Sequence, residues 1–395
     1  MIKPSALDGL IVLDLARRYP GAYSTMFLAD FGARVIKVDP PGTAFPVANM
    51  DTTSEKFAAF YAPDRNKETI VLDLKSEGGR EVFYKLVQKA DVVVEGFRPG
   101  VMKRLKADYD VLSKLNSRLI HCSLTGFGHS GPYGTMPAHD SNFIALGGVL
   151  SFVGPSDGAP CLPGHFLADM AGAGLHGLIG ILLALAAREK TGKGQFVDVS
   201  YLDGTISMLA LEASYYFLTG QIPRRGETIY TGGAVWNSVY KCKDGEYITL
   251  GSTEAHMWEN VCRLLGREDL IPHQNPSSPE ERDRVRSILT EIFLGKTRDE
   301  WFELSRGKDI CLAPVLNIKE TFEDPQVLHR QMVAEIDHPA LGKVQQIGIP
   351  IKLSETPGEI RSLGKVLGAD SDKILRELGY DDEDVRSLRS AGAVS

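Results

Sequence analysis

The most informative stretch of the chain is residues 10–42, which read LIVLDLARRYPGAYSTMFLADFGARVIKVDPPG. Leu10–Leu15 is a short apolar run, Tyr23–Phe31 has the composition of a helix that stops at Gly32, and Val35–Val38 is a second apolar run. A strand, a helix and a strand in this order form a βαβ unit, in which the two strands lie parallel. The stretch therefore predicts the beginning of an α/β sheet.

The same alternation continues through the first 125 residues. Further strands are predicted at Thr69–Leu72, Val92–Glu95 and Leu119–Ser123, and an amphipathic helix is predicted at Glu77–Lys89. Repeated alternation of this kind is typical of an open, mostly parallel sheet with helices on both faces. We therefore expect an α/β fold with a Rossmann-like large domain.

The pattern changes after Gly204, where loops become longer. The segments predicted beyond it are the strands Tyr247–Leu250 and Val344–Ile351 and the helices His256–Leu265, Pro279–Phe293, Asp299–Ser305 and Ser371–Leu378. A chain of 395 residues is usually too long to fold around one compact core. We expect a smaller α+β domain at residues 225–325, and a discontinuous large domain made of residues 1–224 and 326–395.

A long helix is predicted from about Met170 to Arg188, with small residues on its surface and glycines just beyond its end. Its most apolar part, Gly177–Ala187, has eleven residues. A helix needs about 20 residues to span a bilayer, so we expect this segment to be a buried core helix and expect no membrane partner.

Charge and cysteine content narrow the class of protein. The formal net charge is −7, which does not favour binding to nucleic acid. The five cysteines are odd in number and no pair has CxxC spacing, so we expect neither a disulfide framework nor a metal site. The N-terminus also lacks the apolar core of a signal peptide, and we expect a cytoplasmic protein.

The first predicted βαβ unit lacks the usual dinucleotide-binding motif, and two other familiar motifs are absent from the sequence. No GxGxxG follows the first predicted strand, where residues 16–21 read ARRYPG. The sequence also contains no P-loop and no HExxH. The predicted sheet therefore does not indicate a nucleotide cofactor through any of these motifs.

Four residues have side chains suited to catalysis. His139 and Asp140 follow a loop rich in glycine and proline, Asp169 opens the long helix, and Glu254 precedes another predicted helix. Each also has a structural interpretation: an Asp at a helix start stabilises by about 1 kcal/mol. His139 would then be an ordinary loop or core histidine, and Glu254 a solvated helix start. The residues alone leave both interpretations open.

Six motifs in the same order resemble those of the class III CoA-transferase (CaiB/BaiF) superfamily over nearly the whole chain. They are LDLARRYPGAYSTMFLADFGARVIKVDPPG, NKETIVLDLKSEGG, EGFRPGVMKRL, LTGFGHSGPY, REKTGKGQFVDVSYLDG and LRELGYDDEDVRSL. Two further stretches, PAHDSNFIALGGVL (residues 137–150) and GSTEAHMW (residues 251–258), are similar to the α-methylacyl-CoA racemase branch. The C-terminal HPALGKVQQIGIPIKLSETPG is closer to the transferases.

The resemblance implies two alternative chemistries at Asp169. In a racemase, Asp169 and His139 would exchange the α-proton of a 2-methylacyl-CoA, with Asp140 paired to Glu254 or orienting His139. In a CoA transferase, Asp169 would be a nucleophile that passes through an acyl anhydride and an enzyme–CoA thioester, with a free carboxylic acid as the second substrate. We expect the racemase reaction, because a transferase mechanism does not require the His139–Asp140 pair. A non-catalytic scaffold subunit of a hetero-oligomeric transferase is the third possibility.

The resemblance also implies how coenzyme A is held and how the chains assemble. Coenzyme A would enter as part of the substrate, with no permanently bound cofactor and no metal. The residues implied in binding it are Arg18, Tyr19, Leu72, Lys75, Gly96, Phe97 and Arg104. Pro40-Pro41 stands where some relatives have an arginine, which implies different contacts there. The superfamily forms interlocked dimers, so we expect a homodimer, or else a heterodimer with a related subunit.

Overall fold

The structure is a computed structural model that describes residues 5–42 and 51–395. It divides into two compact units. The large unit comprises Met1–Gly147, His165–Met208 and Pro325–Ser395, and the small unit comprises Gly148–Gly164 and Leu209–Asp324. The small unit is larger than the predicted 225–325, partly because Arg225 hydrogen-bonds the carbonyls of Pro155 at 2.7 Å and Ser151 at 3.2 Å and so holds residues 148–164 against it.

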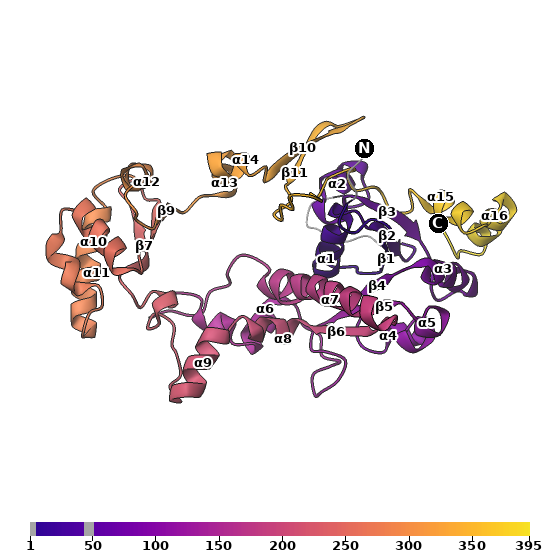
Figure 1. Cartoon of the computed structure of the whole chain (residues 1–395), viewed down its shortest axis with the longest axis horizontal. Helices are drawn as coiled ribbons and strands as arrows, with labels where there is room; N and C mark the ends of the chain where they lie inside the picture. The colour runs from indigo at the N-terminus through magenta and orange to yellow at the C-terminus, as the bar shows by residue number, and fades with distance from the viewer. Residues whose placement is uncertain (1–4, 43–50) are drawn as a thin grey trace. The chain divides into compact units, whose positions relative to one another are not determined.

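A six-stranded parallel sheet forms the centre of the large unit (Figure 1). Its strands are β1 (Ile11–Asp14), β2 (Arg34–Asp39), β3 (Lys67–Val71), β4 (Val92–Glu95), β5 (Ile120–Thr125) and β6 (Phe196–Ser200). Their spatial order is β3-β2-β1-β4-β5-β6, and every neighbouring pair is parallel. This is the strand order of a doubly wound Rossmann sheet, so the predicted fold class is confirmed.

Helices cover both faces of this sheet, because alternate residues of each strand point to opposite sides. On one face Val12 and Val94 pack against α1 (Tyr19–Asp30) and α7 (His176–Thr191). On the other face Leu13 and Val93 pack against α3 (Glu77–Lys89), α5 (Tyr109–Leu115) and α15 (Ser371–Glu377). The large unit is therefore built from both ends of the chain, as a bridge between Leu72 and Val394 also shows.

Shorter elements complete the large unit. They are the helices α2 (Glu55–Phe60), η1 (Ala62–Asp64), α4 (Val101–Arg104), α6 (Asp140–Leu146), α8 (Tyr201–Ser207), α14 (Pro325–His329) and α16 (Asp382–Ser390), and the antiparallel pair β10 (Val333–His338) and β11 (Gly342–Ile347). The predicted strand at Val344–Ile351 corresponds to most of β11.

The long helix predicted from Met170 is two joined segments. Leu167–Leu175 is a π-helix, η3, and α7 continues it to Thr191. Gly192, at φ 72°, ends the helix in the left-handed conformation that glycine adopts without strain. By length and composition alone, Leu167–Thr191 could cross a membrane. Within the large unit, its Leu178 and Ile181 lie in the core, but Ile179, Leu182 and Leu183 are exposed. The predicted buried core helix is therefore buried on one side only.

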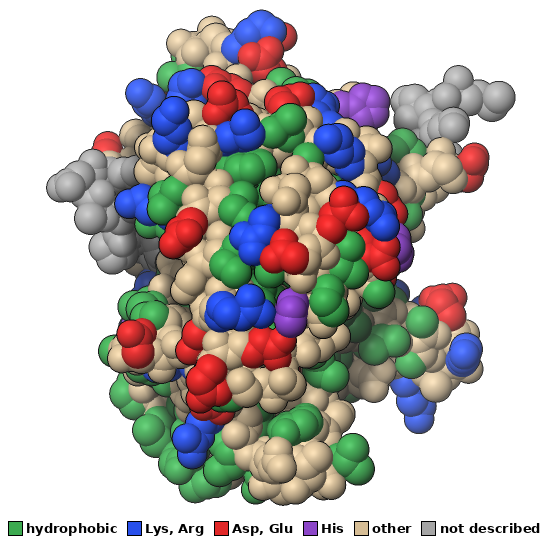
Figure 2. Space-filling view, turned by 90° about the vertical axis from the view of Figure 1, so that its left-hand side faces the viewer, with side chains coloured by type: hydrophobic (Ala, Val, Ile, Leu, Met, Phe, Trp, Pro, Cys, Tyr) green, Lys and Arg blue, Asp and Glu red, His purple; other side chains and the backbone are tan. Residues whose placement is uncertain are grey.

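The small unit has its own core around a three-stranded antiparallel sheet. Its elements are η2 (Val149–Phe152), α9 (Ala210–Thr219), η4 (Ile229–Thr231), β7 (Asn237–Lys241), β8 (Tyr247–Gly251), α10 (Ala255–Leu264), η5 (Glu268–His273), α11 (Pro279–Phe293), α12 (Arg298–Ser305), β9 (Leu312–Pro314) and α13 (Ile318–Glu323). Trp258, Phe293 and Trp301 fill the core. On the side that carries α10–α12, Figure 2 shows acidic and basic side chains interspersed, unlike the basic stripe of a polyanion-binding surface.

Candidate active site

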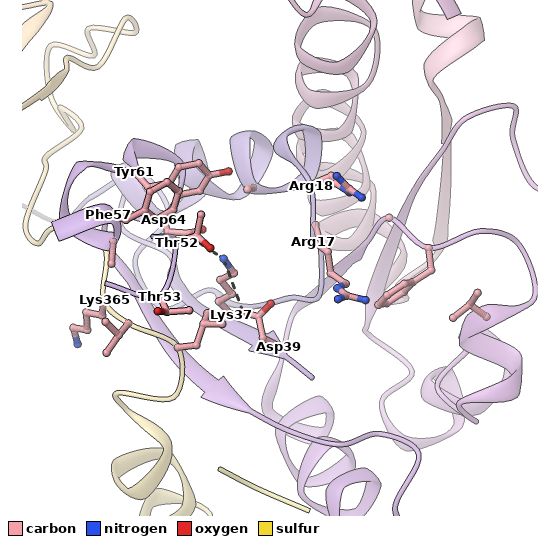
Figure 3. A pocket seen from close by; sticks show the side chains of 18 of the residues that line it. Arg17, Arg18, Lys37, Asp39, Thr52, Thr53, Phe57, Tyr61, Asp64 and Lys365 are labelled. Carbon is pink, nitrogen blue, oxygen red and sulfur yellow. Dashed lines mark hydrogen bonds and ion pairs between the residues drawn. The ribbon is translucent and has the colours of Figure 1, made fainter. Parts of the chain in front are cut away.

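A cavity of about 590 Å³ lies at the carboxyl edge of the parallel sheet (Figure 3). Residues that follow β1, Ala16 to Arg18, form one part of its wall, and residues that follow β4, Gly96 to Arg98, form another. β1 and β4 are neighbours in the sheet, but the chain leaves β1 toward β2 and returns to β4 on the other side. Open α/β sheets bind their ligands at such a switch point.

Charged side chains line this cavity on more than one side. Lys37 and Asp39 come from β2, Asp64 from η1, and Lys365 from the C-terminal segment. Figure 3 shows Arg17 and Arg18 across the cavity from the rings of Phe57 and Tyr61, which also line it. Cations beside aromatic rings suit a ligand that carries both phosphate and planar groups.

Lys37 is held between two carboxylates at the base of the cavity. It hydrogen-bonds Asp64, and its Nζ lies 3.9 Å from Oδ2 of Asp39. Burial raises the pKa of Asp39 to about 6, aided by the charge of Asp64 and opposed by Lys37. Oδ2 of Asp39 is buried and has no hydrogen-bond partner in residues 5–42 and 51–395.

Asp169 lies in the first turn of η3 and is partly buried. Its backbone N–H donates to Oδ1 of Asp140 at 2.9 Å. Burial raises the pKa of the Asp169 carboxyl to about 6, the nearby charge of Asp140 adds to this, and Arg18 opposes it. Because Arg18 also lines the cavity, the carboxylate and the cavity are electrostatically linked. A carboxyl group with a pKa near 6 is suited to proton transfer near neutral pH.

The wide turns of η3 are stabilised by side chains from elsewhere in the large unit. The hydroxyl of Ser24 donates to the carbonyl of Gly174 at 2.6 Å, and Nδ1 of His176 lies 2.8 Å from the carbonyl oxygen of Ala171. A Cβ atom on Gly204 would meet the carbonyl oxygen of Gly172 at 1.8 Å, so α8 and η3 pack backbone against backbone there. π-Helices are rare and are frequent at functional sites, and this one positions Asp169.

His139 and Asp140 lie at the start of α6. Asp140 is buried, and Oδ1 of its carboxylate accepts the hydrogen bond from the backbone N–H of Asp169. His139 precedes it, is exposed, and donates its backbone N–H to Oδ1 of Asn142 at 3.0 Å. The structure therefore places His139 one residue from the group that contacts Asp169.

Glu254 belongs to the small unit. It is exposed and immediately precedes α10, where its side chain makes no capping hydrogen bond with the described helix start. Its predicted pairing with Asp140 stays a prediction.

A row of aromatic rings leads from the cavity toward Asp169. Phe57 stacks on Tyr61 at 5.3 Å between ring centroids, and Tyr61 lies 5.8 Å from Tyr19. Tyr19 in turn stacks on Phe166 at 5.6 Å, and Phe166 is three residues before Asp169. These rings could guide an extended ligand from the cavity to the carboxylate.

The predicted coenzyme-binding residues fall into two groups. Arg18, Gly96 and Phe97 line the cavity, and Tyr19 lies in the adjoining row of rings. Among the described residues that line it, Leu72, Lys75 and Arg104 do not appear. Leu72 is buried in the core of the large unit.

Sequence reasoning did not identify several residues of the cavity wall. They are Arg17, Lys37, Asp39, Tyr61, Asp64, Arg98 and Lys365. Arg17 and Arg98 are next to predicted residues in the sequence, so they could have been predicted from their positions after β1 and β4. Lys365 comes from the far end of the chain, and only the tertiary fold brings it to the cavity.

Comparison with known proteins identifies the family. The model of CoA-transferase family III matches residues 7–371. Human α-methylacyl-CoA racemase is 34% identical over 393 residues, covering 98% of this chain and 96% of that protein. Human succinyl-CoA:glutarate CoA-transferase is 32% identical over 400 residues, covering 100% of this chain and 90% of that protein.

A solved structure supports the same assignment. A CaiB/BaiF family protein from Brucella suis is 30% identical and superposes with a TM-score of 0.79, covering 95% of this chain and all of that one. With a parallel sheet, a cavity at its switch point and a matching family model over most of its length, the chain belongs to CoA-transferase family III.

Proposed function

We propose that the chain racemises or epimerises a 2-methylacyl-CoA by moving its α-proton between His139 and Asp169. The observation that carries the proposal is the hydrogen bond from the Asp169 backbone to Asp140, the residue that follows His139 at the start of α6. The carboxyl group there has a pKa near 6, so it can hold or release a proton at neutral pH.

The reaction needs one proton carrier on each face of the α-carbon. One group removes the α-proton, the electron pair moves onto the thioester carbonyl to give an enolate, and the other group returns a proton to the opposite face. Asp169 would be the base for one stereoisomer and His139 for the other. Racemisation therefore needs both groups, whereas exchange of one isomer with solvent needs only its own base.

Incubation with a single 2-methylacyl-CoA in deuterated water tests this reaction directly. We expect the wild-type chain to incorporate deuterium at the α-carbon, and His139→Ala to lose exchange for at least one stereoisomer. His273→Ala, which removes a histidine of the small unit paired with Glu281, is the matched control and should keep exchange. Wild-type protein that incorporates no deuterium from a range of branched acyl-CoAs would reject the racemase assignment.

CoA transfer is the second candidate, because a relative of almost equal identity is named a CoA-transferase. In that reaction Asp169 would attack the thioester carbonyl and release CoA as a thiolate, which would later attack the resulting anhydride. Hydroxylamine would then trap an activated Asp169 during turnover with a free carboxylic acid. Trapping without α-exchange would favour the transferase, and activity only after addition of a related chain would favour a scaffold subunit.

The cavity is proposed as the site of the coenzyme, with Arg98 as a phosphate ligand. Arg98 is exposed at the cavity wall and forms no ion pair with another described residue. A guanidinium–phosphate hydrogen bond contributes about 1.5–3 kcal/mol, so Arg98→Ala should raise the Kd of coenzyme A by about 10- to 100-fold. Calorimetric titration measures this, with the exposed Arg118→Ala as control; equal affinity in both variants would exclude Arg98 as a ligand.

Asp140→Asn should shift the pH dependence of the reaction. The negative charge of Asp140 raises the pKa of Asp169, so removing that charge should lower it. The amide oxygen of Asn can still accept the hydrogen bond from Asp169. The acid limb of kcat/KM, expected near pH 6 in the wild-type chain, should therefore move to lower pH for the stereoisomer on which Asp169 acts as base. An unmoved or higher limb would contradict this role of Asp140.

We further propose a cytoplasmic homodimer of the interlocked kind. Apolar side chains are exposed on α7 (Ile179, Leu182 and Leu183) and on α9 (Leu211, Phe217 and Leu218). Exposed apolar groups of this extent usually mark an interface, and a second copy of the chain would cover them. Light scattering of the purified chain tests this, and a monomer at micromolar concentration would reject it.

A further inference from the structure

Glu95, at the end of β4, is a buried acidic residue that the proposed reaction does not use. It is 2% exposed, and its Oε2 accepts a hydrogen bond from the backbone N–H of Phe97 at 2.7 Å. Phe97 belongs to residues 96–98, which line the cavity and are called here the coenzyme loop. The carboxylate of Glu95 therefore fixes the backbone of this loop.

A series of polar contacts continues from Glu95 across the sheet. Ser123 is opposite Glu95 on the neighbouring strand β5, and its hydroxyl lowers the pKa of the Glu95 carboxyl, against the larger effect of burial. The same hydroxyl oxygen lies 2.7 Å from Nε2 of His129. His129 belongs to residues 126–139, called here the histidine loop because they end at His139. The chain of contacts thus runs from the coenzyme loop to the histidine loop.

The histidine loop has a second anchor beside the first. The backbone N–H of His129 donates to Oδ2 of Asp198 in β6 at 3.2 Å, and its ring packs edge-on against Phe196 at 5.0 Å. The loop leads directly into Asp140, which contacts Asp169. A movement of His129 would therefore be passed along the loop to the predicted catalytic residues.

The contacts among Glu95, Ser123 and His129 are compatible with either protonation state of Glu95. When Glu95 is ionised, Ser123 donates to it and His129 must donate from Nε2 to Ser123. When Glu95 is protonated, it can donate to Ser123, which then donates to an unprotonated Nε2. Both arrangements keep the hydrogen bonds from Phe97 to Glu95 and between Ser123 and His129, so the contacts between the loops persist through a change of protonation.

Glu95 is expected to change its protonation state near neutral pH because of the groups around it. Burial raises the pKa of Glu95 to about 7, Ser123 and the Phe97 N–H oppose the rise, and Asp198 adds to it. His121 also faces Glu95 at 3.9 Å, but burial lowers its pKa to about 4, so it is neutral. A buried carboxyl group with so perturbed a pKa is typical of a functional site.

We propose that Glu95, Ser123 and His129 are positioning residues that couple the coenzyme loop to the histidine loop, so that coenzyme A in the cavity orders the segment that carries His139. The inference rests on the proposed assignment of the cavity to coenzyme A. None of the three residues is proposed to touch the reacting atoms. They link the binding of coenzyme A at one end of the site to the position of His139 at the other.

Binding of free coenzyme A to the Ser123→Ala and His129→Ala variants tests the coupling. Neither residue lines the cavity among the described residues, yet we expect the Kd to rise by about 5- to 20-fold, which lies within the usual range of coupling between sites. Thr125→Val is the matched control, because Thr125 lies two residues further along β5, is 3% exposed, and its hydroxyl has no partner within the described residues. It should bind within about twofold of wild type.

Amide hydrogen exchange distinguishes coupling from a merely local defect. In the wild-type chain, coenzyme A should slow exchange in both the coenzyme loop and the histidine loop. In Ser123→Ala, a saturating concentration should still protect the coenzyme loop but no longer the histidine loop. Ser123→Thr keeps the hydroxyl, so it should restore both the affinity and the transmitted protection.

The outcomes separate this inference from the proposed function, because both measurements use coenzyme A alone and require no turnover. Wild-type affinity and transmitted protection in Ser123→Ala would overturn the coupling. If the wild-type chain binds no coenzyme A, the cavity assignment fails instead, and so does the coupling to coenzyme A. Faster exchange of residues 126–139 in ligand-free Ser123→Ala, absent in Thr125→Val, would still establish the anchoring role of the three residues.

Discussion

Asp169→Asn is expected to lower turnover by about 10³- to 10⁴-fold or more, whichever reaction the chain performs. As a general base or acid, a positioned carboxyl group contributes about 10²- to 10⁴-fold, and as a nucleophile its loss removes the pathway. Asn has nearly the same shape but can neither take up the α-proton nor form an anhydride. The measurement is deuterium exchange into a 2-methylacyl-CoA together with CoA transfer to free acids.

The stability of the same variant shows whether the loss is chemical. The pKa of Asp169 in the folded chain is raised to about 6 from its ordinary value, so wild-type stability falls as pH rises from that ordinary value to about 6. Asn has no such titration. The melting temperature of Asp169→Asn at pH 8 should therefore equal or exceed that of the wild-type chain. Asp110→Asn, an exposed first-turn carboxylate of α5, should change neither quantity. Retained turnover in Asp169→Asn would exclude both proposed chemistries.

Lys67→Met is expected to destabilise the large unit by about 3–5 kcal/mol, the cost of removing one partner of a buried ion pair. Lys67 is 1% exposed, and its Nζ lies 2.9 Å from Oδ2 of Asp14 and 2.8 Å from Oγ1 of Thr25. It is also 3.4 Å from Oδ1 of Asp64. Met fills a similar volume but leaves the fully buried carboxylate of Asp14 without its cation.

Urea unfolding monitored by circular dichroism measures this loss, and the exposed Lys103→Met is the control. Asp14→Asn combined with Lys67→Met should recover part of the loss, because no uncompensated charge then remains at position 14. Asn can also keep the hydrogen bond that Oδ1 of Asp14 accepts from the backbone of Ala16. A Lys67→Met variant as stable as Lys103→Met would mean that the buried pair contributes little to the folded state.

The strands of the large unit were predictable where both faces of the sheet are buried. β1 and β4 are nearly continuous runs of Val, Ile and Leu, because residues on either side of a central parallel strand pack against helices. β6 was not predicted. Its sequence FVDVS alternates apolar and polar residues at the edge of the sheet, and Asp198 is exposed, so no apolar run reveals it.

The candidate site was predictable only in part. Asp169, the His139–Asp140 pair, Arg18, Gly96 and Phe97 were all identified from the resemblance to the family. The partner of Asp140 was not predicted, because its hydrogen bond to Asp169 spans 29 residues of sequence. Likewise nothing in the local sequence shows that η3 is a π-helix or that Ser24 reaches the carbonyl of Gly174.

The sequence by itself determined the α/β class, the parallel strands and the family, because these follow from local apolar periodicity and from motifs that are contiguous in the chain. The tertiary structure decided which buried polar groups meet: Lys67 with Asp14, Asp140 with the backbone of Asp169, and Glu95 with Ser123 across neighbouring strands. The physical reason is that the energy of a charge or a buried hydrogen bond depends on distance and burial, and the fold sets both between residues far apart in sequence.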